Sequence, residues 1–156
     1  MKRFAILFLL LALLCAVAES EMPQADEGAL ELVKLLSACP SLMSFEETPE
    51  AELSREAVAL YRRQFPYTEL TDAEIYSLIF AHGELNPEVY SVTEFLPVEI
   101  EPEDACELPG NELKLSCIAR QDEGDGFEFA FLADFYLVPS TRSPFGWLVD
   151  KVFFPE

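Results

Sequence analysis

Hydrophobic residues change their spacing partway along this chain. Between residues 29 and 82 they recur at every third or fourth position, which is the spacing of one face of an α-helix. From residue 89 onward they alternate with polar residues or form short β-rich runs, as strands do. Helices followed by antiparallel strands predict an α+β fold, with the helices packed on one face of a curved sheet.

Three helices are expected in the first half. The first buries a stripe between Ala29 and Leu36 and stops before Pro40. The second starts at Thr48-Pro49, an N-cap followed by proline in the first helical position, and ends at Pro66. Its expected buried face contains Leu53, Ala57, Leu60 and Tyr61.

The third expected helix has the clearest boundaries. Thr71 and Glu74 have the spacing of a capping box, in which each side chain satisfies a backbone N–H of the first turn. His82 falls on the same stripe as the apolar residues of this helix, and Gly83 is the expected C-terminal stop.

About four strands are expected in the second half, separated by turns and by an acidic loop at Glu101–Ala105. The strands are Val89–Leu96, Leu113–Ala119, Phe127–Val138 and Trp147–Phe154. The last two are long enough to form a C-terminal hairpin at the centre of the sheet.

Reading this hairpin by face gives the candidate binding residues. If its strands pair symmetrically about the loop at 139–146, Asp134 faces Lys151, and Tyr136 and Trp147 lie on the same face. The opposite face is almost entirely apolar and is the expected core face. A small-molecule site combines apolar walls with a few polar groups, so Asp134, Tyr136, Trp147 and Lys151 are the candidate lining. The alternative is a simple ion pair between Asp134 and Lys151. A shift of one residue would exchange the two faces.

The first 18 residues have the pattern of a signal peptide. Two basic residues precede an apolar run, and Ala16-Val17-Ala18 is a small-x-small cleavage pattern. The run is shorter than the ~20 residues that a spanning helix needs, so no stable membrane span is expected after cleavage. Lipidation of Cys15 is the alternative, although Leu14 is larger than lipoprotein signals prefer. We expect a flexible acidic lead-in at 19–27 and one domain at 28–156.

The net charge of the chain limits the classes of partner that it can bind. The chain has a net charge of −19, which becomes −21 without Lys2 and Arg3. Such a surface repels nucleic acid and anionic lipids, and it favours solubility, cationic partners or loosely held divalent cations. With the signal peptide, this predicts a secreted or periplasmic protein that binds a protein or a small ligand.

Three cysteines remain after cleavage. Export implies an oxidising compartment, and Cys106 and Cys117 flank a turn at Pro109-Gly110, so a disulfide between them is expected. Cys39 would then be a buried free thiol, although its pairing with either of the others stays open.

Catalytic and metal motifs are scarce. His82 is the only histidine, and no Gly-x-Ser-x-Gly sequence occurs. A single histidine without paired cysteines does not favour zinc, and Asp122–Gly126 fits a turn better than a calcium loop. No cofactor or metal is expected.

The order of elements between Leu53 and Phe154 resembles the cystatin-like, ketosteroid-isomerase-like (nuclear-transport-factor-like) superfamily. The resemblance implies N-terminal helices packed into a curved sheet that ends in a long hairpin. Members include enzymes, ligand-binding modules and non-catalytic partner-binding domains, and the strong acidity and export signal of this chain depart from the usual pattern.

Three hypotheses follow. The first is an exported, non-catalytic domain that binds a partner or ligand through the sheet or through Phe145, Trp147 and Tyr136 near the hairpin tip. The second is an enzyme with a ketosteroid-isomerase-like pocket, in which Asp134 is the base and Tyr136 a hydrogen-bond donor. The third is an acidic inhibitor or immunity-type protein that neutralises a basic partner.

Overall fold

The computed structural model describes residues 26–44, 51–85, 95, 97–122 and 127–155. In these residues three α-helices and one 3-10 helix precede a four-stranded antiparallel sheet. The elements are α2 (Glu27–Ser37), η1 (Pro40–Ser44), α3 (Ala51–Gln64), α4 (Asp72–Ile79), β1 (Val98–Leu108), β2 (Glu112–Asp122), β3 (Glu128–Pro139) and β4 (Trp147–Phe153). The predicted α+β class is therefore confirmed. None of the described helices combines the length and the hydropathy that crossing a bilayer requires.

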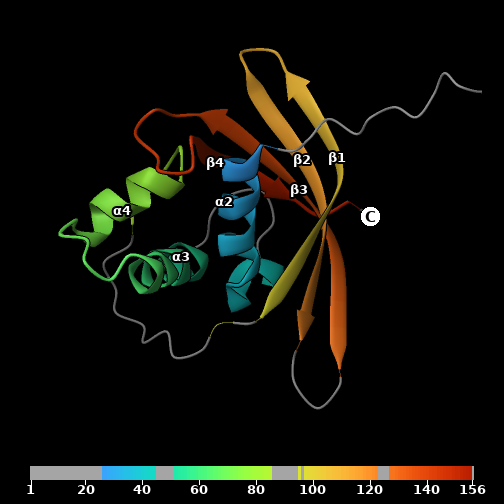
Figure 1. The fold of residues 1–156 in the computed structure, drawn as a ribbon, viewed down its shortest axis with the longest axis horizontal. Helices are drawn as coiled ribbons and strands as arrows, with labels where there is room; N and C mark the ends of the chain where they lie inside the picture. Colours follow the sequence, from blue (N-terminus) through green and yellow to red (C-terminus); the bar gives the residue numbers. More distant parts are fainter. Residues whose placement is uncertain (1–25, 45–50, 86–94, 96, 123–126, 156) are drawn as a thin grey trace, which may run out of the picture.

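The described helices all lie on one side of the sheet (Figure 1). Helix α2 packs directly on the sheet, where it contacts β1 and β4, and α4 contacts β4. Helix α3 packs against α2 and α4. The strands follow one another in space in the order β1-β2-β3-β4. We call the helix-covered side of the sheet the inner face and the opposite side the outer face.

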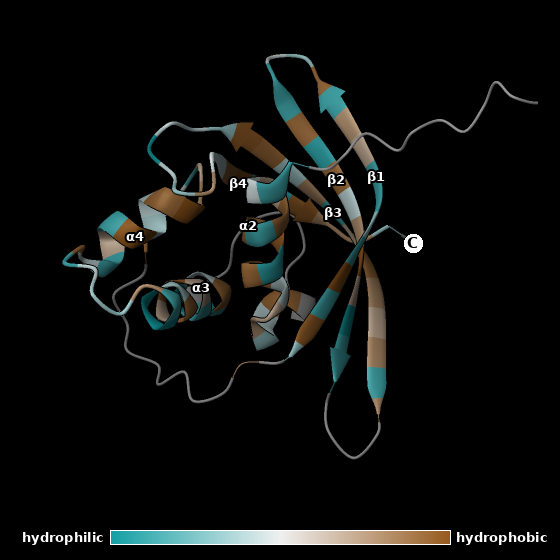
Figure 2. Ribbon diagram, viewed as in Figure 1, coloured by the Kyte–Doolittle hydropathy of each residue, from teal (hydrophilic) through white to brown (hydrophobic). Residues whose placement is uncertain are grey.

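Strict alternation along β2 and β3 builds the inner face. Because successive side chains of a strand point to opposite sides, every second residue of each strand faces the helices. Figure 2 shows the alternation of hydrophobic and hydrophilic positions along β2. The buried inner residues pair across the two strands: Leu113 with Leu137, Leu115 with Phe135, Cys117 with Ala133 and Ala119 with Phe131.

Helix α2 is fixed at its N-terminus by the loop between β3 and β4. The Asp26 carboxylate accepts a hydrogen bond from the Ala29 N–H as an N-cap and a second from Trp147 Nε1 at 3.0 Å. Gly28 lies against the backbone of Phe145, so closely that a Cβ atom would be 2.0 Å from the Phe145 carbonyl oxygen. The last residues of the expected lead-in therefore belong to the fold.

Helix α4 has the predicted capping box, with hydrogen bonds in both directions between Thr71 and Glu74. The helix ends before Gly83, because Phe80 is already extended and forms a parallel bridge with Val149 of β4. His82 therefore lies beyond the helix, and its exposed side chain is not part of the buried stripe.

Two predictions about the strands are wrong. Glu101–Ala105 is not a loop but the middle of β1, with an irregularity between Pro102 and Asp104. An edge strand can carry many solvated acids and a proline, so its sequence does not look like that of a central strand. The C-terminal hairpin is not at the centre of the sheet either. Its second strand, β4, is an edge strand of the sheet, as β1 is on the other side. The signal peptide at 1–18, the helix start expected at Thr48-Pro49 and the strand expected at Val89–Leu96, apart from Phe95, lie outside the described residues.

The predicted register of the C-terminal hairpin is also wrong. Asp134 pairs with Phe153 rather than with Lys151, and Lys151 pairs with Tyr136. Asp150 is an extra residue in β4, because Leu137 pairs with Val149 while the next residue, Tyr136, pairs with Lys151. Such a β-bulge changes the face to which all later side chains point.

The predicted disulfide is absent, since Cys39, Cys106 and Cys117 are all free. Cys106 is exposed and pairs with Lys114 on the outer face, whereas Cys117 is buried on the inner face. Cysteines on opposite faces of a sheet point apart and cannot be bridged without backbone movement. Burial raises the pKa of the Cys117 thiol to about 12, and burial also raises that of Cys39.

Candidate functional site

The outer face of the sheet brings together three of the four candidate residues. Asp134, Tyr136 and Lys151 all point away from the helices, since their register partners alternate with those of the core. No described helix lies on this face (Figure 1). The outer face is therefore the side of the sheet that the described helices leave uncovered.

Asp134 is the centre of a polar cluster on this face. It is only 6% exposed, although none of the described helices covers it. Ser116, its partner on β2, donates a hydrogen bond from Oγ to Asp134 Oδ1 at 2.5 Å. Lys114 Nζ lies 2.7 Å from Asp134 Oδ2. Both carboxylate oxygens are thus engaged, and the charge is held in one orientation before any partner arrives.

The ion pair also affects Lys114. The hydrogen bond to Asp134 raises the pKa of the Lys114 ammonium, against the opposing effect of partial burial. Lys114 is 30% exposed at its side chain, whereas the Asp134 side chain is 9% exposed. The lysine therefore covers the solvent side of the carboxylate. The ion pair stabilises the folded state most at pH values at which both groups are charged.

Apolar side chains surround this cluster. Leu132 and Phe153 are 42% and 41% exposed and lie on the same face of the sheet as Asp134. Phe153 lies opposite Asp134 on β4, and Leu132 pairs with Ile118 on β2. Aromatic residues are enriched at protein interfaces, whereas charged residues are depleted at their centres.

Tyr136 and Lys151 form a second contact on the same face. Lys151 Nζ lies 4.5 Å from the centre of the Tyr136 ring, within the range of a cation–π interaction. The expected ion pair between Lys151 and Asp134 is not formed, because Asp134 pairs with Lys114 instead.

Trp147, the fourth candidate, is not on the outer face. Its ring packs against the core and its Nε1 donates to Asp26. Phe145, another aromatic residue expected to be exposed near the hairpin tip, is 8% exposed and belongs to the core. Both residues hold the terminal loop on α2, so their role in this fold is structural.

His82 contacts the sheet through the bulge. Its Nε2 lies 2.9 Å from Oδ1 of Asp150, the extra residue in β4. The hydroxyl of Tyr76 donates to the His82 carbonyl oxygen at 2.6 Å. These contacts fasten the segment after α4 to β4. No group of three or more metal-binding side chains occurs among the described residues.

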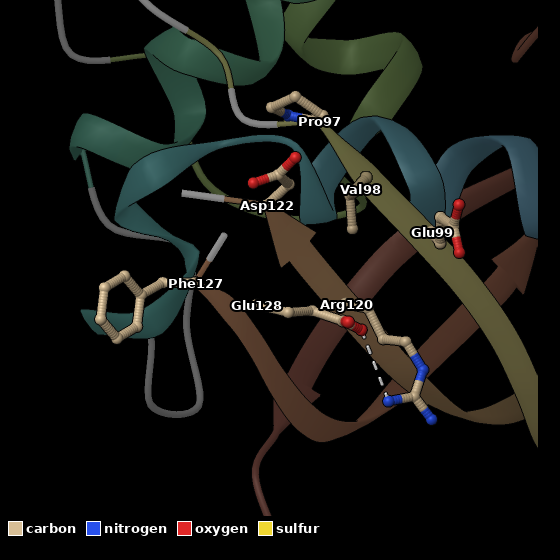
Figure 3. Close-up of a pocket in the computed structure, with 7 residues that line it drawn as sticks. All are labelled: Pro97, Val98, Glu99, Arg120, Asp122, Phe127 and Glu128. Atoms are coloured by element: carbon tan, nitrogen blue, oxygen red, sulfur yellow. Dashed lines mark ion pairs between the residues drawn. The ribbon is translucent and has the colours of Figure 1, made fainter. Parts of the chain in front are cut away.

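A cavity of about 540 Å³ lies at one end of the outer face, where β2 and β3 approach their connecting turn (Figure 3). It is lined by Pro97, Val98, Glu99, Arg120, Asp122, Phe127 and Glu128. Arg120 lies 3.6 Å from carboxylate oxygens of both Glu128 and Glu101. None of the residues chosen from the sequence lines this cavity.

Sequence reasoning missed Lys114, Ser116 and Arg120. All three occupy the polar positions of the alternating run in β2, which places them on the face opposite the core. That signal was available, but their partners depended on how β2 pairs with β3 and β1.

In comparisons with known proteins, no family model, curated protein or solved structure matches this chain. The resemblance to the cystatin-like and ketosteroid-isomerase-like superfamily therefore stays a prediction. The arguments below rest on the geometry of the chain itself.

Proposed function

We propose that this protein is an exported, non-catalytic domain that binds a protein partner through the outer face of its sheet. The observation that carries the proposal is the fixed Asp134 cluster with exposed Leu132 and Phe153 beside it. The signal-peptide pattern of residues 1–18 supports export.

Three features favour a protein over a small ligand. The apolar residues and the Asp134 cluster lie on the face of a sheet, and neither Leu132 nor Phe153 lines the cavity at its end. Outer-face side chains of β2, β3 and β4 lie next to one another, so a partner with a broad surface contacts all three strands. The ordered Asp134 carboxylate needs no rearrangement on binding, which lowers the entropic cost of association.

Direct pairing of a partner strand with β1 is disfavoured. This edge strand carries Pro102 and an irregularity beside it, and its exposed residues include five acids. Proline, bulges and charges are the usual means by which proteins block edge-to-edge pairing. Contact through the side chains of the outer face is therefore the mode that we propose.

The enzyme hypothesis has less support. A general base needs a carboxylate that is free to take a proton from a substrate in a pocket. Asp134 is instead hydrogen bonded to Ser116 and paired with Lys114. The geometry around Asp134 thus favours a fixed structural charge over proton transfer.

The proposal predicts that Leu132→Glu abolishes binding. The immobilised chain from residue 19 onward should retain a partner from the extracytoplasmic material of its source, and Leu132→Glu should reduce retention at least tenfold. Burying an unpaired carboxylate in an interface costs more than the ~1.4 kcal/mol that a tenfold loss requires. Quantitative mass spectrometry of the retained proteins measures the effect.

Tyr67→Glu is the matched control, because Tyr67 is 95% exposed in the loop between α3 and α4 and the change adds the same charge. The control should retain the partner as the unchanged protein does. Equal retention by both variants, or equal loss, would contradict binding through the outer face.

A further inference from the structure

We propose that the first half of β3 pairs with the same segment of a second copy of this chain, which gives a dimer with one continuous sheet. Strand β3 has 12 residues and β4 only seven, and their pairing starts at Asp134 and Phe153. Figure 1 shows β3 continuing beyond the end of β4. Residues 128–133 pair with β2 on one side, and no described strand or turn is hydrogen bonded to their other side, which we call the free edge.

The free edge lacks the features that block strand pairing at β1, which are Pro102, an irregularity and several exposed acids. Residues 128–133 contain no proline and no lysine, and their register with β2 is regular. Their only charged side chain, Glu128, lies 3.6 Å from Arg120 Nη1. A regular, apolar edge with unpaired backbone groups is a template that another strand can extend.

Exposed apolar side chains gather at the free edge. Phe129 is 45% exposed and Leu132 is 42% exposed. Phe129 occupies an inner-face position, where its ring centre is 6.3 Å from that of Phe131, and the Phe131 ring is in turn 6.0 Å from that of Phe154. Leu132 is on the outer face. A strand added at this edge therefore covers aromatic rings on one side of the sheet and Leu132 on the other.

A second copy matches this edge because the segment is self-complementary. Two identical antiparallel strands are related by a two-fold axis normal to the sheet, and residues that pair lie on the same face. Phe129 and Phe131 of both copies then meet on the inner side, and Ala130 and Leu132 meet on the outer side. Since both copies use the same segment, the assembly closes as a dimer.

The charge distribution also favours a second copy. The chain has a net charge of −19, so two copies repel each other over most of their surfaces. Residues 128–133 hold one carboxylate, which already lies beside Arg120, so this edge lets two copies approach and offers little to a cationic partner. Salt shortens the screening length from about 8 Å at 0.15 M to about 3 Å at 1 M. Dimerisation should therefore strengthen with salt, whereas binding of a cationic partner would weaken.

Sedimentation velocity of the chain from residue 19 tests the dimer. The contact is short and its interface small, so we expect mostly monomer at ~5 µM and mostly dimer at ~500 µM in 0.15 M salt. The dissociation constant should fall at least about threefold in 1 M salt. A reductant excludes a disulfide through the exposed Cys106.

Phe129→Glu should raise the dissociation constant at least about tenfold, because it places a carboxylate among the phenylalanine rings of the contact. Tyr67→Glu adds the same charge at a residue that is 95% exposed between α3 and α4, and it should dimerise as the unchanged chain does. Hydrogen exchange of the unchanged chain locates the contact without a substitution. Amides of residues 128–133 should exchange more slowly at the higher concentration, whereas those of β1 should not change.

A monomer at ~500 µM, equal dimerisation of the two variants, or slower exchange in β1 instead of at 128–133 would overturn the second copy as the occupant. If residues 128–133 become protected only when the protein partner is bound, a strand of that partner occupies the free edge instead.

The dimer does not depend on the proposed function. The two-fold axis places the outer faces of both copies on the same side of the joined sheet, so the surface proposed for the partner stays open. A monomeric chain whose partner is lost in Leu132→Glu would overturn only the dimer. A dimer combined with full retention of the partner by Leu132→Glu would overturn only binding through the outer face.

Discussion

Gly28→Ala should lower the free energy of unfolding by about 3 kcal/mol, the upper part of the range for inserting a methyl group where no space exists. The added Cβ would lie 2.0 Å from the carbonyl oxygen of Phe145, so either α2 or the loop between β3 and β4 must move. Elsewhere in a helix the same change stabilises by up to about 1 kcal/mol, so the sign of the effect is itself diagnostic.

The loop cannot yield easily, because it is held at several points. Ser143 Oγ donates to the Leu78 carbonyl oxygen at 2.8 Å, and Trp147 Nε1 donates to Asp26. Moving the loop would break contacts with both α4 and α2. Trp147 is the only tryptophan in the chain, so urea unfolding followed by its fluorescence reports on this junction directly.

Glu31→Ala on the same helix is the control and should change stability by no more than about 0.5 kcal/mol, because Glu31 is exposed. If Gly28→Ala were as stable as this control, the close contact between α2 and the terminal loop would be refuted.

Lys114→Met should cost about 2–3 kcal/mol at pH 7, because it leaves the Asp134 carboxylate without its cation. The Asp134 side chain is 9% exposed and, among the described residues, keeps only the hydrogen bond from Ser116. Full removal of a partner from a buried pair costs more, but Lys114 is partly solvated and water can enter in its place. Urea titrations of the two proteins measure the difference.

The effect should depend on pH in one direction. The folded pKa of Lys114 is raised, chiefly by its hydrogen bond to Asp134, above the ~10.4 of an unfolded chain. A raised lysine pKa stabilises the folded state fully below the unfolded value, and this contribution is lost as pH rises through the folded value. The gap between the original protein and Lys114→Met should therefore be constant from pH 7 to about pH 10 and narrow above it.

Lys151→Met is the matched control, since it removes the same charge from the same face. Lys151 is exposed and contacts only the Tyr136 ring among the interactions described, so we expect a loss below about 1 kcal/mol. Equal losses for the two substitutions would mean that the Asp134 cluster is not a fixed feature of the outer face.

Local patterns predicted the elements that depend on local chemistry. The capping box at Thr71 and Glu74, the buried stripe of α2 and the inner residues of β3 were all readable, because spacing alone determines which side chains share a face. The strand at Glu101–Ala105 was missed because an edge strand is selected for solubility as well as for pairing.

The site was harder to predict because it depends on strand register. Val149 and Val152 are three residues apart, and both face inward only because Asp150 forms a bulge between them. Because we assumed strict alternation along β4, we predicted Trp147 on the face of Asp134 and paired Asp134 with Lys151. Two buried valines at odd spacing are the signal that a bulge was required, whereas the pairing of Asp134 with Lys114 and Ser116 follows only from the alignment of β2 with β3.

Site-specific photo-crosslinking tests the central claim, binding through the outer face, most directly. A photoreactive phenylalanine analogue is placed at Phe153 or at Tyr67, and the chain is irradiated with the extracytoplasmic material of its source. We predict a covalent adduct from Phe153 and none from Tyr67, because the first is on the outer face and the second is on the loop between two helices. An adduct from Tyr67 alone, or no adduct from Phe153, would contradict the account.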